Sequence, residues 1–120
     1  MSAPISAPMS ADVLLILTTL PDKEAAGRMA RALVEQGLAA CVNVLPSCHS
    51  VYRWQGKVEA AEEVLLCIKS TRLRYPDVEA QIRARHPYEL PEIIAISLAD
   101  GLPAYLAWVH KETEPPCAVC

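Results

Sequence analysis

Apolar residues recur along the first part of the chain with periods that predict a strand followed by a helix. Val13–Thr19 is aliphatic and β-branched and is limited by Pro21, which predicts a buried strand. A helix is predicted to follow, from an Asp22 N-cap to about Gln36, with Gly37 just beyond its end. Its apolar face carries residues at helical spacing: Ala26, Met29, Ala30 and Leu33.

The middle of the chain predicts a long β-hairpin. Residues 39–54 are mostly apolar at even positions, and Pro46 with the Ser-Cys-His-Ser run after it predicts a bulge or bend. The sequence WQGK at residues 54–57 predicts the turn, with Gly56 at positive φ. The return strand, to about Ser70, carries Val64, Leu66 and Ile68 on one face and Leu65 and Cys67 on the other. Because both faces are apolar, one can take the helices of the domain and the other needs a partner.

The remaining residues predict a second helix, a strand and a terminal helix. The second helix is predicted from Thr71 to just before Pro87, with Pro76 in its first turn. Its inner side carries Leu73, Val78 and Ile82. A strand over residues 92–98 and a helix over residues 102–111 follow, and the apolar side of this helix carries Leu102, Tyr105, Leu106 and Val109. This order predicts an α+β, ferredoxin-like βαββαβ sandwich with an antiparallel sheet, helices on one face, a long central hairpin and an extra C-terminal helix.

Length and composition predict one domain that associates with itself. The chain has 120 residues, of which 52% are apolar, and its mean hydropathy is +0.20. These values are high for a small monomer, so some apolar surface is predicted to be buried by self-association. The domain is predicted over residues 12–112, between a disordered leader at residues 1–11 and a flexible tail at residues 113–120.

Charge and hydropathy argue against several kinds of partner. The net charge of −3 argues against a nucleic-acid or anionic-membrane surface. The first apolar run, Val13–Leu17, is too short to cross a bilayer, and no cationic side chain precedes it, so no secretory signal is predicted. These features predict a cytoplasmic protein, in which an odd count of 5 cysteines indicates free thiols.

The sequence carries no local pattern of a catalytic site. It lacks the phosphate-loop and dinucleotide patterns, the HExxH zinc pattern and a nucleophile elbow. Cys117 and Cys120 form a single CxxC pair, which is either a stray pair of the tail or a soft-metal clamp. Asn43, the only asparagine, is either a buried hydrogen-bonding residue or an anion ligand.

Four segments resemble the divalent-cation tolerance family, CutA: LAACVNVLPSCHSVYRWQGKVE, EEVLLCIKST, HPYELPEIIAI and YLAW. The resemblance covers about residues 13–112. It implies a ferredoxin-like subunit in a tight homotrimer, in which long hairpins extend each sheet into the neighbouring subunits. The family is named for tolerance to copper and other divalent cations, some members bind copper, and no enzymatic reaction is established for it. The fold and trimer also resemble the PII signalling proteins, which bind small effectors between subunits.

The resemblance identifies two candidate metal ligands. His86 matches the histidine of the HPYE segment and is the first candidate, and Cys41, at a position where the family often has cysteine, is the weaker one. Some members have a histidine where this chain has Arg85 and a cysteine where it has Thr18. Because two ligands are missing, copper or another divalent cation is predicted to be held weakly or indirectly.

Three functions are consistent with these features. The first is a non-enzymatic homotrimer for divalent-cation tolerance. The second is a PII-like regulatory trimer that binds a small anionic or polar effector in clefts between subunits, because polar and aromatic groups gather at strand ends. Its predicted cleft residues are Trp54, Lys69, Tyr88, Glu89 and Glu92. The third is a scaffold whose trimer presents surfaces to partners.

Overall fold

The computed structural model describes residues 12–116 of the chain. In chain order its elements are β1 (Val13–Leu20), α2 (Lys23–Glu35), β2 (Cys41–Trp54), β3 (Lys57–Thr71), α3 (Tyr75–Arg85), β4 (Ile94–Ser97) and α4 (Pro103–Glu112). The leader predicted at residues 1–11 and the last four residues of the predicted tail, 117–120, lie outside the described residues.

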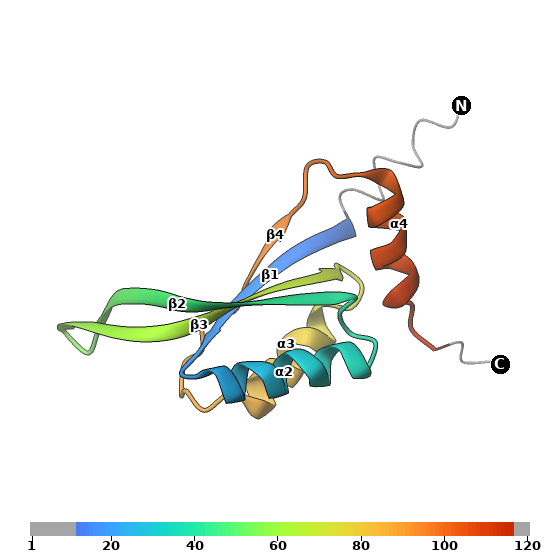
Figure 1. Cartoon of the computed structure of the whole chain (residues 1–120). Helices are drawn as coiled ribbons and strands as arrows, with labels where there is room; N and C mark the ends of the chain where they lie inside the picture. Colours follow the sequence, from blue (N-terminus) through green and yellow to red (C-terminus); the bar gives the residue numbers. More distant parts are fainter. Residues whose placement is uncertain (1–11, 117–120) are drawn as a thin grey trace.

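The strands form one antiparallel sheet in the order β2-β3-β1-β4. Figure 1 shows α2 and α3 beside each other against one face of this sheet, while the β2–β3 hairpin extends well beyond both helices. The predicted α+β, ferredoxin-like fold with a long central hairpin and an extra C-terminal helix is confirmed.

The main core lies between the sheet and the helices α2 and α3. The strand residues that point into it and are at most 1% exposed are Leu14, Ile16, Leu20, Leu66 and Ile68. The helix residues that pack against them are Ala26, Met29, Leu33, Val78 and Ile82, all predicted to lie on inner faces. The Asp22 carboxylate caps α2 by accepting the Ala25 N–H at 2.8 Å, and Gly37 follows the helix with φ of +71°, both as predicted.

Two predicted boundaries and the predicted inner position of Leu73 are wrong. Helix α3 begins at Tyr75 rather than Thr71, because Thr71 still belongs to the β1–β3 ladder. Leu73 therefore lies in the turn between strand and helix and is 70% exposed. Strand β4 is shorter than the predicted 92–98, because the ladder it forms with β1 spans only Leu14–Leu17.

Helix α4 packs on the opposite side of the sheet from α2 and α3. Its Leu106 and Val109 form a second, smaller core with Val13 of β1. Side chains alternate along a strand, so Val13 points away from its neighbour Leu14, which faces the main core. Leu106 and Val109 are buried as predicted, whereas Leu102, predicted on the same apolar side, is 70% exposed because it precedes the helix.

The hairpin contains a bulge and a tight turn, both as predicted. The β2–β3 register shifts between Leu45 and Cys48. At the tip, Gln55 and Gly56 both have positive φ, 50° and 81°, as the two central residues of a type I′ turn require. We call residues 48–62, beyond the bulge, the arm. Each residue of the arm is exposed or half-buried.

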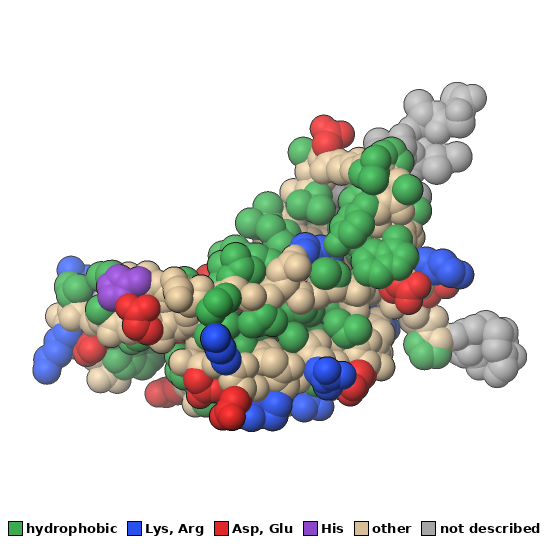
Figure 2. Space-filling model, viewed as in Figure 1, with side chains coloured by type: hydrophobic (Ala, Val, Ile, Leu, Met, Phe, Trp, Pro, Cys, Tyr) green, Lys and Arg blue, Asp and Glu red, His purple; other side chains and the backbone are tan. Residues whose placement is uncertain are grey.

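The sheet face that α2 and α3 leave uncovered is also apolar, and we call it the open face. Alternation and strand register place on it Leu15, Leu17, Leu65, Cys67, Ile94 and Ile96. Ile94 and Ile96 are 49% and 47% exposed, and Tyr105 and Trp108 of α4 are also exposed. Figure 2 shows hydrophobic side chains gathered on the side of the molecule where β4 and α4 lie. The prediction that β3 is apolar on both faces is therefore confirmed.

Candidate functional site

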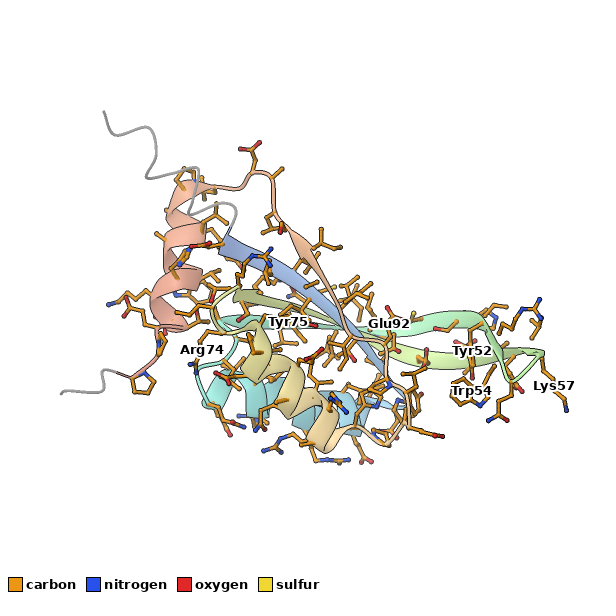
Figure 3. The ribbon with its side chains drawn as sticks, turned by 180° about the vertical axis from the view of Figure 1, so that it is seen from behind. Tyr52, Trp54, Lys57, Arg74, Tyr75 and Glu92 are labelled. Atoms are coloured by element: carbon orange, nitrogen blue, oxygen red, sulfur yellow. The ribbon has the colours of Figure 1, made fainter. Side chains whose placement is uncertain are left out.

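A cleft of about 850 Å³ lies between the arm and the loop that leads into β4. It is lined by Thr19 at the end of β1, residues 50–54 of the arm, Glu63 at the base of the arm and residues 88–94. Figure 3 shows Tyr52 and Trp54 on the arm and Glu92 nearer to its base. Four segments of the chain, in β1, β2, β3 and the loop into β4, thus contribute to this one cleft.

Strand alternation presents the arm's aromatic residues to the cleft. Tyr52 pairs with Glu59 and Trp54 pairs with Lys57, so these side chains share the face of the hairpin on which Glu63 lies. Tyr52 and Trp54 are 45% and 37% exposed, which leaves part of each ring accessible. The type I′ turn and the ladder therefore hold two aromatic rings beyond the core.

His86 attaches the loop side of the cleft to the end of β1. The backbone N–H of Tyr88 donates to His86 Nδ1 at 3.1 Å. Nδ1 must therefore be the acceptor nitrogen, so the proton is on Nε2, which donates to the Thr19 carbonyl at 2.7 Å. The His86 ring also lies 4.7 Å from the Tyr88 ring, centroid to centroid. His86 thus uses both ring nitrogens to position Tyr88.

Tyr88 in turn binds a buried carboxylate. Its hydroxyl donates to Glu63 Oε2 at 2.7 Å, and Glu63 is only 8% exposed. Burial, followed by the hydrogen bond and the negative charge of Glu63, raises the pKa of Tyr88 well above its ordinary value. The phenol therefore stays protonated and keeps donating, which holds the loop and the base of the arm together.

Four of the five predicted cleft residues line this cleft: Trp54, Tyr88, Glu89 and Glu92. The fifth, Lys69, lies elsewhere. Its ammonium group donates to Asn43 Oδ1 and lies 3.8 Å from the Cys41 sulfur. Asn43, for which burial or anion binding was predicted, is exposed and accepts this hydrogen bond.

Among the lining residues that sequence reasoning missed are Tyr52 and Glu63. Tyr52 could have been found, because it lies two residues from Trp54 and alternation places both on one face. Glu63 could not, because its burial depends on Tyr88, which is 25 residues away in the chain. The sequence around Glu63 indicates only a strand with glutamates.

The two predicted metal ligands lie apart. His86, just after α3, contacts the Thr19 carbonyl near the end of β1, whereas Cys41 begins β2 and lies opposite Lys69 near α4. Burial, and after it the neighbouring Cys41, raises the pKa of Tyr105 of α4. Within residues 12–116, no three His, Cys, Asp or Glu side chains are grouped closely enough to hold one metal ion.

Residues 14–112 match the family described as CutA1 divalent ion tolerance protein. The divalent-cation tolerance protein CutA of Thermus thermophilus is 44% identical over 99 residues, which cover 82% of this chain and 96% of that protein. Its solved structure superimposes with a TM-score of 0.83, covering 84% of this chain and 98% of the other. Protein CutA of Mus musculus is 46% identical over 96 residues, 80% of this chain and 54% of the mouse protein. The chain therefore spans about half the length of its mouse relative.

One further relative bears on location. The structure of a protein described as the periplasmic divalent cation tolerance protein CutA of Archaeoglobus fulgidus is 37% identical, with a TM-score of 0.82. The match covers 85% of this chain and 99% of that one. Of the helices between residues 12 and 116, none has both the length and the apolar character needed to cross a bilayer.

Proposed function

The chain belongs to the CutA1 divalent ion tolerance family, and on that premise we propose that it is a cytoplasmic, non-enzymatic homotrimer for tolerance of copper and other divalent cations. Its own metal binding is weak or indirect in this proposal. The observation that carries the assembly is the open face, where Ile94 and Ile96 are about half exposed beside half-buried Leu15, Leu17 and Leu65. A contiguous apolar patch of this kind is typical of a surface that other subunits cover.

Light scattering tests the assembly. We expect a particle of three chains of 13.1 kDa each. Ile96→Lys places a charge on the open face and should shift the particle towards single chains, because an unpaired charge is costly inside an interface. Leu73→Lys is the matched control, because Leu73 is 70% exposed in the turn before α3, away from the open face. A wild-type particle of 13.1 kDa would contradict the proposed assembly.

Hydrogen bonding around His86 supports the weak metal binding. A metal ion can bind His86 only if the ring gives up its bond to the Thr19 carbonyl or to the Tyr88 N–H. The free energy of the lost hydrogen bond opposes metal binding, so the affinity of His86 for a metal ion is lowered.

Titration with Cu(II), monitored by calorimetry, tests this site. We expect weak binding in the wild type and weaker binding in His86→Ala, with Cys41→Ser as the variant of the second candidate. His49→Ala is the control, because His49 lies on the arm in an exposed pair with Glu62. An unchanged copper affinity in His86→Ala would remove His86 as a ligand.

The cleft favours a second candidate function, a regulatory trimer that binds a small effector. Its volume of about 850 Å³ lies in the range of small-molecule sites, roughly 300–1,000 Å³. Four residues predicted as cleft walls line it. A thermal-shift screen of metabolites should give hits that Trp54→Ala weakens, and a screen without hits would count against this function.

Cell fractionation tests the proposed location. The chain should be found with cytoplasmic marker proteins. Recovery with periplasmic or organelle markers would contradict the proposal, and the relative from Archaeoglobus fulgidus that is described as periplasmic makes this a real alternative.

A further inference from the structure

Carboxylates outnumber cations in the lining of the cleft. Glu63, Glu89 and Glu92 line it, and Arg53 is the one basic residue among its lining residues. Arg53 pairs with Val58 in the ladder, so alternation directs its Cβ to the opposite face of the arm from the aromatic residues. The charge distribution of the cleft therefore favours a cation over an anion.

The position of Lys69 adds to the excess of carboxylates over cations in the cleft. An anionic or polar ligand was predicted from the sequence with Lys69 as a wall residue. In the structure, the Lys69 ammonium group contacts Asn43 and Cys41, outside the cleft lining. The cation that would have bound an anionic ligand is therefore absent from the cleft lining.

Aromatic rings accompany the carboxylates. Tyr52 and Trp54 present partly exposed rings from the arm, and Tyr88 contributes a third ring from the loop. Figure 3 shows the side chains of Tyr52 and Trp54 projecting from the same side of the arm. The face of an aromatic ring attracts a cation through its quadrupole, and it also stacks on flat apolar groups.

The carboxylates are spread along the cleft. Glu63 comes from β3, and Glu89 and Glu92 lie three residues apart in the loop. Glu63 Oε2 is already engaged by the Tyr88 hydroxyl. Such a lining suits a molecule with a charged end and a flat or apolar body better than it suits a single small ion, which needs ligands converging on one point.

We propose that this cleft binds a small organic cation, a protonated amine or guanidinium attached to a flat or apolar body. The cationic end meets the carboxylates of Glu89 and Glu92, and the body stacks on Trp54 and Tyr52. The inference rests on the proposed effector function of the cleft and specifies the chemical class of the effector.

Three probes that share one ring and differ in charge test the inference: benzylammonium, benzyl alcohol and benzoate. Each is titrated into the full-length protein at low salt, and amide and indole N–H resonances are followed by NMR. We expect benzylammonium to shift the Trp54 indole and the amides of residues 88–94 in a saturable way. Benzyl alcohol should bind more weakly and benzoate should leave these resonances unchanged. Added salt should weaken the benzylammonium binding, because screening reduces attraction between exposed charges.

Four variants locate the site. Glu89→Gln, Glu92→Gln and Trp54→Ala should each weaken benzylammonium binding by about two- to fivefold, the size expected for exposed ion pairs and cation–π contacts. Glu62→Gln is the control, because it removes the same charge from the arm, where Glu62 pairs with His49 outside the cleft lining. If Glu62→Gln weakens binding as much as Glu92→Gln, the attraction is a general one and the proposed site is wrong.

The result with benzoate separates the two proposals. If benzoate shifts the cleft resonances as strongly as benzylammonium, the cationic class is overturned while the effector function stands. If no probe of any charge shifts these resonances in the folded protein, the organic-cation site is overturned. If the metabolite screen is empty as well, the effector function of the cleft fails with it.

Discussion

The two halves of strand β3 differ in what covers them. From Glu63 to Thr71, every residue is buried or half-buried, and Leu66 and Ile68 are fully buried against α2 and α3. From Lys57 to Glu62, the residues are exposed except for half-buried Ala61. Yet the same ladder with β2 runs along both halves. Figure 1 shows the second half extending past the ends of the helices.

This difference teaches that backbone pairing and apolar burial are separate sources of order in the hairpin. A two-stranded ladder alone is marginally stable in water. The arm carries Val51 and Val58 at 63% and 67% exposure, so its own chain does not cover its apolar side chains. In the proposed assembly, neighbouring subunits supply that cover, whereas the base half needs only α2 and α3.

The largest expected effect comes from truncating one residue in each half. Leu66→Ala should lower the free energy of unfolding by about 2–5 kcal/mol, because Leu66 is fully buried and a cavity remains. Val58→Ala in the arm should cost less than Leu66→Ala, because Val58 is 67% exposed on its own chain and only a neighbouring subunit can cover it. Both values come from urea unfolding at one protein concentration, because stability of an oligomer depends on concentration. Equal losses would remove the distinction between the halves.

The next largest effect is expected at Glu63, where the burial of β3 begins. Tyr88→Phe removes the hydroxyl that donates to this buried carboxylate. Leaving a buried acceptor without its donor should lower the free energy of unfolding by about 1–3 kcal/mol. Tyr75→Phe is the matched control, because the Tyr75 hydroxyl donates to Glu79 over a longer distance, 3.3 Å, and we expect a smaller loss. If the control loses as much, the bond to Glu63 has no special role.

Wild type and Tyr88→Phe should also differ in how their free energies of unfolding depend on pH. The pKa of Tyr88 is raised in the folded state, by burial first and then by Glu63, whereas an unfolded tyrosine ionises near its ordinary pKa of about 10. Below that pH both states are protonated, so the stabilisation by Tyr88 is fully present. Above it, the unfolded state loses the proton while the folded state keeps it, so the free energy of unfolding falls. The advantage of wild type over Tyr88→Phe should therefore be constant from pH 7 to pH 9 and shrink above about pH 10. A constant difference at higher pH would contradict the raised pKa.

The fold could be predicted from sequence because its signals are local and redundant. Period-2 and helical patterns, the Asp22 cap and the WQGK turn each act within a few residues. The errors at Thr71 and Leu73 arose where strand and helix join without a glycine. There the ladder with β1 decides where β3 ends, and a local pattern does not contain that partner.

The site could be predicted only in part, for the same physical reason. Trp54, Tyr88, Glu89 and Glu92 follow from being aromatic or acidic at strand ends and loops. The misplacement of Lys69 also has a non-local origin. Lys69 is on the same face of β3 as Glu63 but lies further along the strand, opposite Cys41 and away from the arm, and this position depends on the register between β2 and β3. The charge of the cleft, and with it the class of ligand, therefore depended on a pairing that the sequence did not specify.

The smallest expected effect is at the tip of the arm and tests whether turn geometry alone supports it. Gly56 has φ of +81° and no atom within 4 Å of an added Cβ, so Gly56→Ala meets backbone strain without a clash. We expect a loss of about 1 kcal/mol in the free energy of unfolding. Gly27→Ala is the control with the opposite sign. An added Cβ there also meets no atom within 4 Å, but Gly27 lies within α2, where alanine should add about 0.5–1 kcal/mol. A gain at both positions would mean that the turn does not hold the arm, and that its order comes from a covering subunit instead.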